Sequence, residues 1–263
     1  MSLITVDAAS CRRDGLCIRD CPTQILGWGA NGLPEAIPGL EALCLNCGHC
    51  IAICPHAALA LGTLRAEELE PVLSECAVSS EAAAQFLKSR RSVRLFTTRP
   101  VPHDLLTRVL DVTRWAPTAT NRQPLRWLVV ETPNKLCELS RMIADGLRPI
   151  PYFERMVEGY DKGVDRILRG APQLVVAYAP VEGFDPSTDC TISLAYLDLA
   201  AHAHGLGTCW AGVLFAAMMF NSAIVPFLGI PEKHKVCGAM MIGYPQYSYA
   251  RIPERNPLQV TWA

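Results

Sequence analysis

The sequence predicts a chain of mixed α and β structure with a small cysteine-rich domain at residues 1–64, an acidic helical connector at 65–80 and a larger domain with a central sheet at 81–263. Three observations support this division. Two copies of one cysteine motif lie before residue 64. Residues 1–80 carry four basic and nine acidic side chains, whereas residues 81–263 carry twenty basic and sixteen acidic ones. After residue 80, amphipathic helices alternate with short apolar strands.

The first domain contains a cysteine run with the spacing C-x2-C-x2-C-x3-C-P, which reads CLNCGHCIAICP at residues 44–55. In bacterial ferredoxins three thiolates of such a run bind one iron-sulfur cluster, and the cysteine before proline binds the neighbouring cluster. The offsets recur from Cys11 to Pro22, with Asp14 where the second cysteine would stand. The crossed scheme assigns Cys11, Cys17, Cys54 and, as a candidate, Asp14 to cluster A, and Cys44, Cys47, Cys50 and Cys21 to cluster B.

Closely spaced cysteines also occur in structural zinc sites and in disulfides of secreted chains. Zinc has little use for paired C-P endings, so the iron-sulfur interpretation is favoured. Asp14 leaves the type of cluster A open, because a hard carboxylate is a weaker partner for iron sulfide than a thiolate. Cluster B is expected as 4Fe-4S, and cluster A either as 4Fe-4S with a labile, aspartate-bound iron or as 3Fe-4S. The other five cysteines (Cys76, Cys137, Cys190, Cys209 and Cys237) are predicted to be free, mostly buried thiols.

The composition is that of a globular protein, with half of the residues apolar and a net charge of −1. No basic segment with a following apolar run opens the chain, and no stretch reaches the length of a membrane span, so a cytoplasmic location is expected. No basic stripe with interleaved aromatic residues suggests a nucleic-acid partner.

Periodicity predicts the elements in order. Short strands are expected after each C-P pair, at 25–28 and 58–61, and the connector is expected to be helical with an interruption at Pro71. Residues 188–204 are apolar almost all round, which indicates a helix buried in the core or across a dimer interface. In the larger domain, helices are predicted at 81–88, 104–115, 135–144, 154–168, 188–204 and 216–227, and strands at 127–130, 174–178, 208–213 and 236–242.

Four segments of the larger domain carry side chains suited to an anionic, aromatic cofactor. The first is RRSVR at 90–94, whose guanidinium groups can bind a phosphate in bidentate fashion. The others are WAPTATNRQP at 115–124, GLGTCWAG at 205–212, and GYP at 243–245 with the arginines that follow it. The Gly205-x-Gly207 element follows a helix and leads into a strand, the reverse of the dinucleotide-binding context.

In this order and at these separations, the four segments resemble the FMN-dependent nitroreductase family over residues 82–263, and the whole chain resembles its ferredoxin-fused branch. The resemblance implies an α+β fold with a central mixed sheet and an extensive homodimer interface that holds FMN. Arg90, Ser92, Arg94 and Arg255 would hold the phosphate and ribityl chain, with Arg91 and Arg251 as weaker choices. Pro117, Thr118 and Asn121 would border the ring on one side, and Cys209, Trp210, Ala211 and Gly212 on the other.

The pairing of modules predicts an oxidoreductase in which the clusters relay electrons to or from the flavin, with the chemistry at flavin N5 and a small organic acceptor as substrate. The donor is expected to be reduced ferredoxin or NAD(P)H. Residues 141–169, with Tyr152, Phe153 and Tyr160, are expected to supply substrate contacts or to pack the dimer. Alternatives are a non-catalytic electron carrier or redox sensor, and another reaction on the same fold, such as reductive dehalogenation, enone reduction or flavin breakdown.

Overall fold

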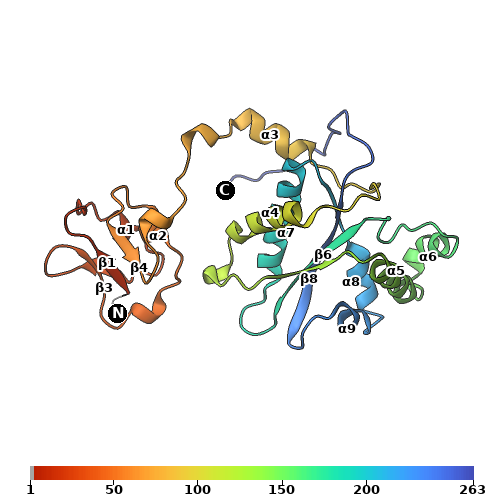
Figure 1. Cartoon of the computed structure of the whole chain (residues 1–263), viewed down its shortest axis with the longest axis horizontal. Coiled ribbons are helices and arrows are strands. Elements are labelled where there is room, and N and C mark those ends of the chain that lie inside the picture. Colours follow the sequence, from red (N-terminus) through yellow and green to blue (C-terminus); the bar gives the residue numbers. More distant parts are fainter. Residues whose placement is uncertain (1–2) are drawn as a thin grey trace. The chain divides into compact units, whose positions relative to one another are not determined.

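The computed structural model describes residues 3–263, which divide into two units. The first comprises residues 1–77 with the short segment 120–122, and the second comprises residues 78–119 and 123–263. Figure 1 shows the elements of both units. Within residues 3–263, no helix combines the length and apolar character needed to cross a membrane.

The first unit contains two antiparallel strand pairs and two short helices. Strand β1 (Ile4–Val6) pairs with β4 (Leu59–Leu61), and β2 (Leu26–Trp28) pairs with β3 (Pro34–Ala36). The helices are α1 (Leu16–Arg19) and α2 (His49–Ala52), and a 3-10 turn, η1 (Glu41–Leu43), precedes the second cysteine run. Both strands predicted next to the C-P pairs are present as β2 and β4.

The cysteine repeat is also a repeat of backbone conformation. Helix α1 follows Gly15 at φ 69°, and α2 follows Gly48 at φ 73°. Two further pairs of residues with positive φ, Arg13 with Asn46 and Gln24 with Ala57, share the offset that separates Cys11 from Cys44. Such conformations are uncommon outside glycine, so their recurrence shows that both motifs fold into the same loop.

The second unit is built on a four-stranded sheet with the order β5-β6-β8-β7. Its strands are β5 (Arg126–Val130), β6 (Gln173–Pro180), β8 (His234–Gly243) and β7 (Gly207–Trp210). All three pairings are antiparallel, and the one parallel pairing among the described residues is the isolated bridge between Ser92 and Thr208. The four-stranded sheet itself is antiparallel, and the predicted mixed character is limited to that one parallel bridge.

Helices cover both faces of this sheet (Figure 1). On one face α4 (His103–Asp111) and α7 (Ser187–Ala203) pack against Val175 and Ala177 of β6. On the other face α5 (Pro133–Leu147), α8 (Gly212–Met218) and α9 (Ile224–Leu228) pack against Leu174 and Val176, with α6 (Glu154–Asp161) beyond α5. Because successive strand residues face opposite sides, one apolar strand supplies both cores.

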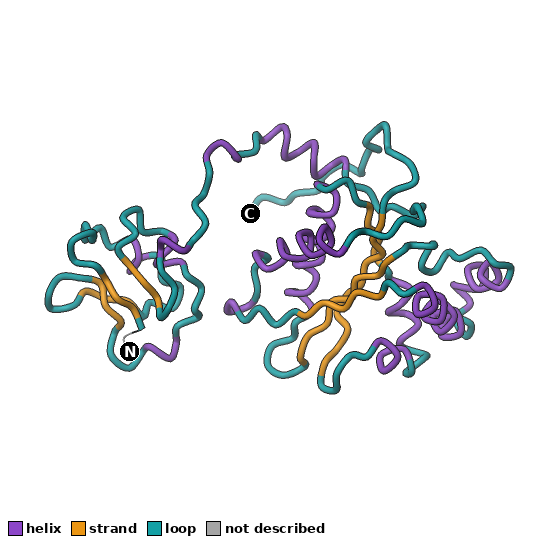
Figure 2. The backbone as a smooth tube through the Cα atoms, in the orientation of Figure 1, coloured by secondary structure: helices purple, strands orange, loops and turns teal. Residues whose placement is uncertain are grey.

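Three boundaries differ from the sequence-based prediction (Figure 2). The helix predicted at 216–227 is two helices, α8 and α9, separated by a turn around Asn221, whose side chain accepts a hydrogen bond from Ala223 N–H at 3.2 Å. The strand predicted at 208–213 ends at Trp210 because Gly212 starts α8. The helix predicted at 154–168 ends at Asp161, before Gly163 at φ 81°.

The remaining elements confirm the predicted order. Helix α3 (Ser80–Ser89) begins where Ser79 Oγ accepts a hydrogen bond from Ala82 N–H at 3.2 Å. The predicted helix 104–115 is α4 followed by the 3-10 turn η4 (Val112–Trp115). The connector differs from the prediction, since it contains only the 3-10 turns η2 (Ala66–Glu68) and η3 (Ser74–Cys76), and α-helix starts only at Ser80.

Candidate cofactor sites

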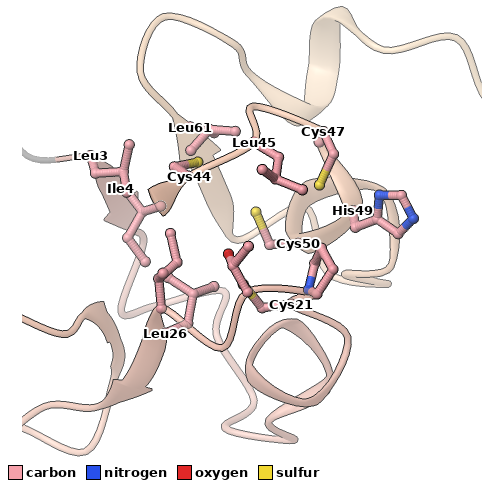
Figure 3. A pocket seen from close by; sticks show the side chains of 14 residues that line it. Leu3, Ile4, Cys21, Leu26, Cys44, Leu45, Cys47, His49, Cys50 and Leu61 are labelled. Carbon is pink, nitrogen blue, oxygen red and sulfur yellow. The ribbon is translucent and has the colours of Figure 1, made fainter. Parts of the chain in front are cut away.

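The eight predicted cluster ligands line two cavities of the first unit. Cys21, Cys44, Cys47 and Cys50 surround a space of about 370 Å³, shown in Figure 3. Cys11, Asp14, Cys17 and Cys54 surround a second space of about 330 Å³. In each cavity the residue that precedes proline comes from the other motif. The geometry thus groups the residues in the crossed pattern that the spacing predicts.

Burial and like charges act on cysteines of both cavities. Burial, together with the like charges of the neighbouring Cys47, Cys17 and Cys21, raises the pKa of Cys50 to about 11. Burial likewise raises the pKa of Cys17, helped by Cys54 and Asp14. Several thiolates crowded together repel one another unless metal neutralises them. These surroundings are compatible with the predicted clusters.

The described residues do not by themselves distinguish a cluster from a single metal ion. Among residues 3–263, no three His, Cys, Asp or Glu side chains lie close enough together to hold one ion. A cubane spans several atoms, so its thiolates stand farther apart than ligands of one ion. All twelve cysteines are free of disulfides. The cluster and zinc interpretations both stay predictions.

His49 and His56 lie beside the two cavities, one at each. His49 lines the cavity of Cys44, Cys47 and Cys50. His56 lines the other, with Nε2 3.9 Å from Oδ2 of Asp14. Asp14 Oδ1 also accepts a hydrogen bond from Leu16 N–H, the first residue of α1, at 3.1 Å.

In the second unit, the segment 90–94 lies against β7. Ser92 bridges Thr208, and Val93 N–H donates to the Thr208 carbonyl at 2.8 Å. Gly207 makes this approach possible, because a Cβ there would lie 2.5 Å from Val93 Cγ2. The glycine pattern at 205–207 therefore has a packing role, with Gly205 at φ 70° ending α7.

Guanidinium groups gather around Cys209. Burial raises the pKa of the Cys209 thiol, and the positive charges of Arg94, Arg169 and Arg90 oppose that rise. Arg90 also pairs with Asp198 of α7 at 3.2 Å, and Asp198 accepts a hydrogen bond from Thr208 Oγ1. Convergent arginines fit a phosphate group. The sequence motifs did not predict Arg169, because it lies outside all four segments and acts on Cys209 only through the tertiary fold.

A cavity of about 740 Å³ extends from Arg90 and Arg91. Thr208 and the start of the C-terminal segment, with Tyr247 and Tyr249, complete its wall. Arg251 and Arg255 follow in that exposed segment. His202, which also lines this cavity, shares a hydrogen bond with Ser89 Oγ at 3.0 Å and packs on Phe86.

The residues predicted to contact the flavin ring lie in two places. Trp210 is 41% exposed and stacks on Phe215 at 6.4 Å, while the buried Ala211 donates its N–H to the Ala239 carbonyl at 2.9 Å. Gly212 starts α8. The loop with Pro117 and Thr118 belongs elsewhere: Thr118 lines a cavity with Trp127 and Ser193.

The loop 117–121 is held in a defined shape. Ala119 N–H donates to Asp189 Oδ1 of α7 at 3.0 Å, and Gln123 N–H donates to Thr118 Oγ1 at 3.0 Å. Thr120 and Asn121 have positive φ values of 51° and 56°. Thr118 lines the cavity next to Trp127, and none of Cys209, Trp210, Ala211 and Gly212 lines that cavity or the one at Arg90.

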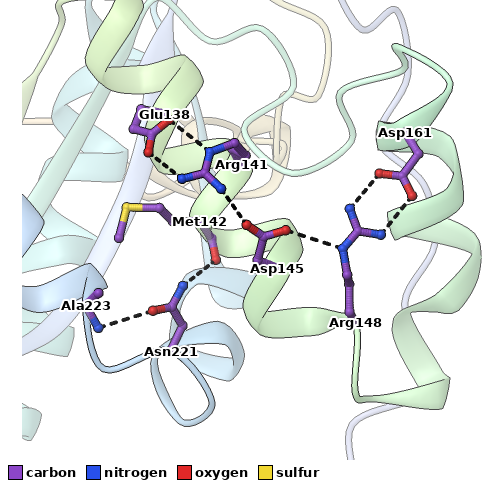
Figure 4. A network of polar contacts seen from close by, with 8 residues as sticks. All are labelled: Glu138, Arg141, Met142, Asp145, Arg148, Asp161, Asn221 and Ala223. Atoms are coloured by element: carbon purple, nitrogen blue, oxygen red, sulfur yellow. Dashed lines mark hydrogen bonds and ion pairs between the residues drawn. The ribbon is translucent and has the colours of Figure 1, made fainter.

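The region 141–169 is an ordered surface and not a loose loop. Arg141 joins Glu138 and Asp145, and Arg148 joins Asp145 to Asp161 of α6 (Figure 4). Of the three aromatic residues predicted to contact substrate, Tyr152 is 88% exposed, whereas Phe153 and Tyr160 pack against the core. The paired charges therefore hold α6 on α5.

The comparisons with known proteins agree with this geometry. The Nitroreductase family model matches residues 87–244. The chain is 27% identical over 173 residues to the "Putative NADH dehydrogenase/NAD(P)H nitroreductase" of Methanothermobacter thermautotrophicus, covering 64% of this chain and 80% of that protein. It is 22% identical to iodotyrosine deiodinase 1 of Rattus norvegicus, covering 68% of this chain and 67% of that one.

Among solved structures, the chain resembles a Bacteroides fragilis nitroreductase with bound FMN. The TM-score is 0.58 and the identity 23%, and the match covers 68% of this chain and 98% of that one. At this identity the likeness concerns the fold. The family model matches more than half of the chain, and its range includes the arginine segment, β7 and the whole four-stranded sheet. The chain belongs to the Nitroreductase family.

Proposed function

We propose that this protein is an FMN-dependent oxidoreductase in which two iron-sulfur clusters relay electrons to or from the flavin, for reduction of a small organic acceptor. The observation that carries the proposal is the grouping of eight predicted ligands into two separate cavities, four in each, in a chain of the Nitroreductase family. Two sets of ligands and one flavin fold in one chain favour electron transfer between them.

The bound groups would supply the redox chemistry, since clusters carry electrons singly whereas a flavin exchanges them singly or in pairs. The protein binds and positions these groups. In the proposal, Cys11, Cys17 and Cys54 hold cluster A with Asp14 as the fourth ligand, and Cys21, Cys44, Cys47 and Cys50 hold cluster B. The bond between Asp14 and iron would be the weakest of the ligand bonds. Cluster A would therefore be either 4Fe-4S with a labile iron or 3Fe-4S.

The flavin phosphate is assigned to Arg90, Ser92 and Arg94, with Arg169 as an additional cation. Positive charge from Arg94, Arg169 and Arg90 acts at Cys209 against burial and the negative charge of Asp198, and the same arginines would attract a phosphate group. Asp198 holds Arg90 in position through their ion pair at 3.2 Å. Arg91, Arg251 and Arg255 remain proposed phosphate contacts.

The ring is assigned to two groups of residues from two subunits. Pro117, Thr118 and Asn121 form one group, and Cys209, Trp210, Ala211 and Gly212 form the other. The family resemblance implies a flavin at the homodimer interface, where a second copy would complete the site. The exposed Trp210, Trp115 and Tyr196 provide apolar surface for that homodimer.

Reduced ferredoxin or NAD(P)H is proposed as the electron donor, and a nitroaromatic compound is the model acceptor. The name of the Methanothermobacter relative favours NAD(P)H, and the cluster cavities favour a one-electron donor. The similarity to iodotyrosine deiodinase 1 makes reductive dehalogenation the second candidate reaction. We propose the cytoplasm as the site of action, where clusters and thiols stay reduced.

Anaerobic rapid mixing tests the relay. The full chain, reconstituted with iron, sulfide and FMN, is mixed with limiting reduced ferredoxin or with NADPH, and cluster and flavin absorbance are followed separately. We expect ferredoxin to reduce the clusters first and the flavin afterwards. Flavin reduction by NADPH with idle clusters would contradict the relay in this direction.

Ligand variants test the two cavities. Cys21→Ser and Cys54→Ser are each expected to lower the iron content by roughly half, because each removes a ligand of one of two clusters. Cys76→Ser is the matched control, since Cys76 is exposed and lies outside both cavities. An unchanged iron content in both variants would overturn the assignment. If the flavin is reduced but no small acceptor is turned over, the result would favour the alternative that the protein is an electron carrier.

A further inference from the structure

Two cysteines outside all of the sites above form a pair in the second unit. Cys190 lies in the first turn of α7 and is 0% exposed. Cys237 lies in β8 and is half-buried. The two elements meet here, since Lys235 Nζ of β8 donates to Ser187 Oγ of α7 at 3.0 Å, and the two thiols influence each other as neighbours although they are far apart in the sequence. The proposed flavin and cluster chemistry uses neither of them.

The backbone of β8 directs Cys237 towards this contact. In the ladder with β6, Gly238 is opposite Ala177 and Val236 is opposite Tyr178, so Cys237 is the extra residue of a β-bulge. A bulge leaves one residue unpaired and changes the direction of its side chain. The Cys237 thiol donates to the Lys235 carbonyl at 3.6 Å. The bulge therefore positions the thiol beside α7.

The surroundings make the two sulfurs chemically different. The Cys190 hydrogen bond lowers the pKa of Cys237, and the positive charge of Lys235 lowers it further, although burial opposes both. The same bond raises the pKa of Cys190, and burial raises it further. Lys235 Nζ is held in place by Asp185 and by Ser187 Oγ at 3.0 Å. Cys237 is thus the nucleophilic and more accessible thiol, and Cys190 retains its proton.

We propose that Cys237 and Cys190 form a reversible redox site, in which hydrogen peroxide converts the two thiols to a disulfide that joins β8 to α7. The Cys237 sulfur attacks one peroxide oxygen, so that an S–O bond forms, the O–O bond breaks and water leaves after protonation. The Cys190 sulfur then attacks the sulfenic sulfur. An S–S bond forms, the S–O bond breaks, and the second oxygen leaves as water with the Cys190 proton.

The electrons and atoms balance in this sequence. Two thiols lose two electrons and two protons in total, and one peroxide becomes two waters. A dithiol such as dithiothreitol reverses the reaction by thiol–disulfide exchange and becomes a disulfide itself. The step needs neither flavin nor cluster, so its test is independent of the proposed function.

The site joins two segments that the proposed flavin site uses. Asp189, next to Cys190, accepts the hydrogen bond from Ala119 N–H at 3.0 Å. Ala239, two residues after Cys237, accepts the hydrogen bond from Ala211 N–H at 2.9 Å. A bond between the two sulfurs would therefore act on elements that hold both groups of predicted ring contacts.

Peptide mapping of the full chain tests the proposal. Protein treated with one equivalent of hydrogen peroxide is blocked with iodoacetamide and cut with trypsin, which cleaves after Arg169, Lys233, Lys235 and Arg251. The expected product links peptide 170–233 to peptide 236–251 and is two hydrogens lighter than the separate peptides. Dithiothreitol before blocking should remove it. Cys209 lies in the first peptide as an internal control and should be found alkylated.

Variants sharpen the result. The linked peptide should persist in Cys209→Ser and be lost in Cys237→Ser. Lys235→Gln should slow its formation, because loss of the positive charge raises the pKa of Cys237 and lowers the thiolate fraction, and Lys235→Arg should restore the rate. Lys233→Gln, which removes an ammonium near Glu182, should leave the rate unchanged.

Peptide mapping of the wild-type protein tests the proposal even if a variant fails to fold. Alkylation of both Cys190 and Cys237 after peroxide treatment would overturn the proposal. Oxidation of Cys237 to sulfinic acid without a linked peptide would do the same, as would a link through Cys209 instead of Cys190.

Discussion

Asp198 of α7 connects the arginine segment to β7, because its carboxylate pairs with Arg90 at 3.2 Å and accepts a hydrogen bond from Thr208 Oγ1. The side chains of Asp198 and Arg90 are only 17% and 25% exposed. One carboxylate therefore fixes the orientation of a cation and of the strand beside it, in the place where we assign the flavin phosphate.

Replacement of this carboxylate should be costly. Asp198→Asn is expected to lower the free energy of unfolding by about 1–3 kcal/mol, because it leaves a largely buried guanidinium without its charged partner. Chemical denaturation of the variant and the wild type measures the change. Asp104→Asn is the control, since its pair with Arg108 is exposed and should contribute about 0–0.5 kcal/mol. Equal effects in both variants would contradict the role of Asp198.

Gly207 should not tolerate a side chain. In Gly207→Ala the new Cβ would lie 2.5 Å from Val93 Cγ2 and 2.7 Å from Val93 Cβ, and the stiff valine has no easy way to move. A loss of about 1–3 kcal/mol in unfolding free energy is expected from this overpacking. Gly159→Ala is the control, because its nearest atom would be 3.8 Å away in helix α6. A stable Gly207→Ala protein would show that the segment 90–94 can shift.

Arg169 should contribute to anion binding. Arg169→Gln is expected to weaken FMN binding about tenfold, which corresponds to about 1.4 kcal/mol. Fluorescence titration of the flavin measures the affinity. Arg166→Gln, in the same segment and exposed, should bind FMN as the wild type does. If both variants bind equally well, the charge at Arg169 acts on Cys209 without contacting the ligand.

Asp14 should control the iron content of cluster A. In Asp14→Cys a thiolate replaces the carboxylate, so all four iron atoms should be held more firmly. Iron analysis and paramagnetic resonance after brief exposure to ferricyanide measure the difference. Asp7→Asn is the control, because Asp7 Oδ1 accepts a hydrogen bond from Ala9 N–H and Asp7 lies outside the cavity. An unchanged spectrum in Asp14→Cys would mean that Asp14 does not govern the iron content.

Glu131 should make stability depend on pH at the acid end. Hydrogen bonds from Gln173 and His103 lower the pKa of Glu131 in the folded protein. The unfolded chain then binds the proton more readily, so stability is present above about pH 4.3, the pKa of a free Glu, and is lost as pH falls through the lower folded value. Thermal melting of wild type and Glu131→Gln between pH 7 and 3 tests this. The difference between the two should shrink as pH falls, and a constant difference would refute the linkage.

The sequence by itself determined the features that depend on short-range geometry. The cysteine spacing identified both loops, because a helix that starts after Gly15 or Gly48 turns nearby side chains to one side. The periodicity located α7 and β6, since burial of alternate or every third to fourth residue is a local pattern. It located α8 and α9 less well, because Asn221 ends the first helix through a bond to the chain that follows.

Only the tertiary structure decided which distant residues meet. Arg169 reaches the neighbourhood of Cys209, Asp198 reaches Arg90, and Cys190 reaches Cys237 because sheet register and helix packing join segments that no spacing rule connects. The bulge at Cys237 shows the reason. A shift of one residue in the register turns the following side chains to the other face, and this shift is a property of the pairing of β8 with β6, between Ala177 and Tyr178.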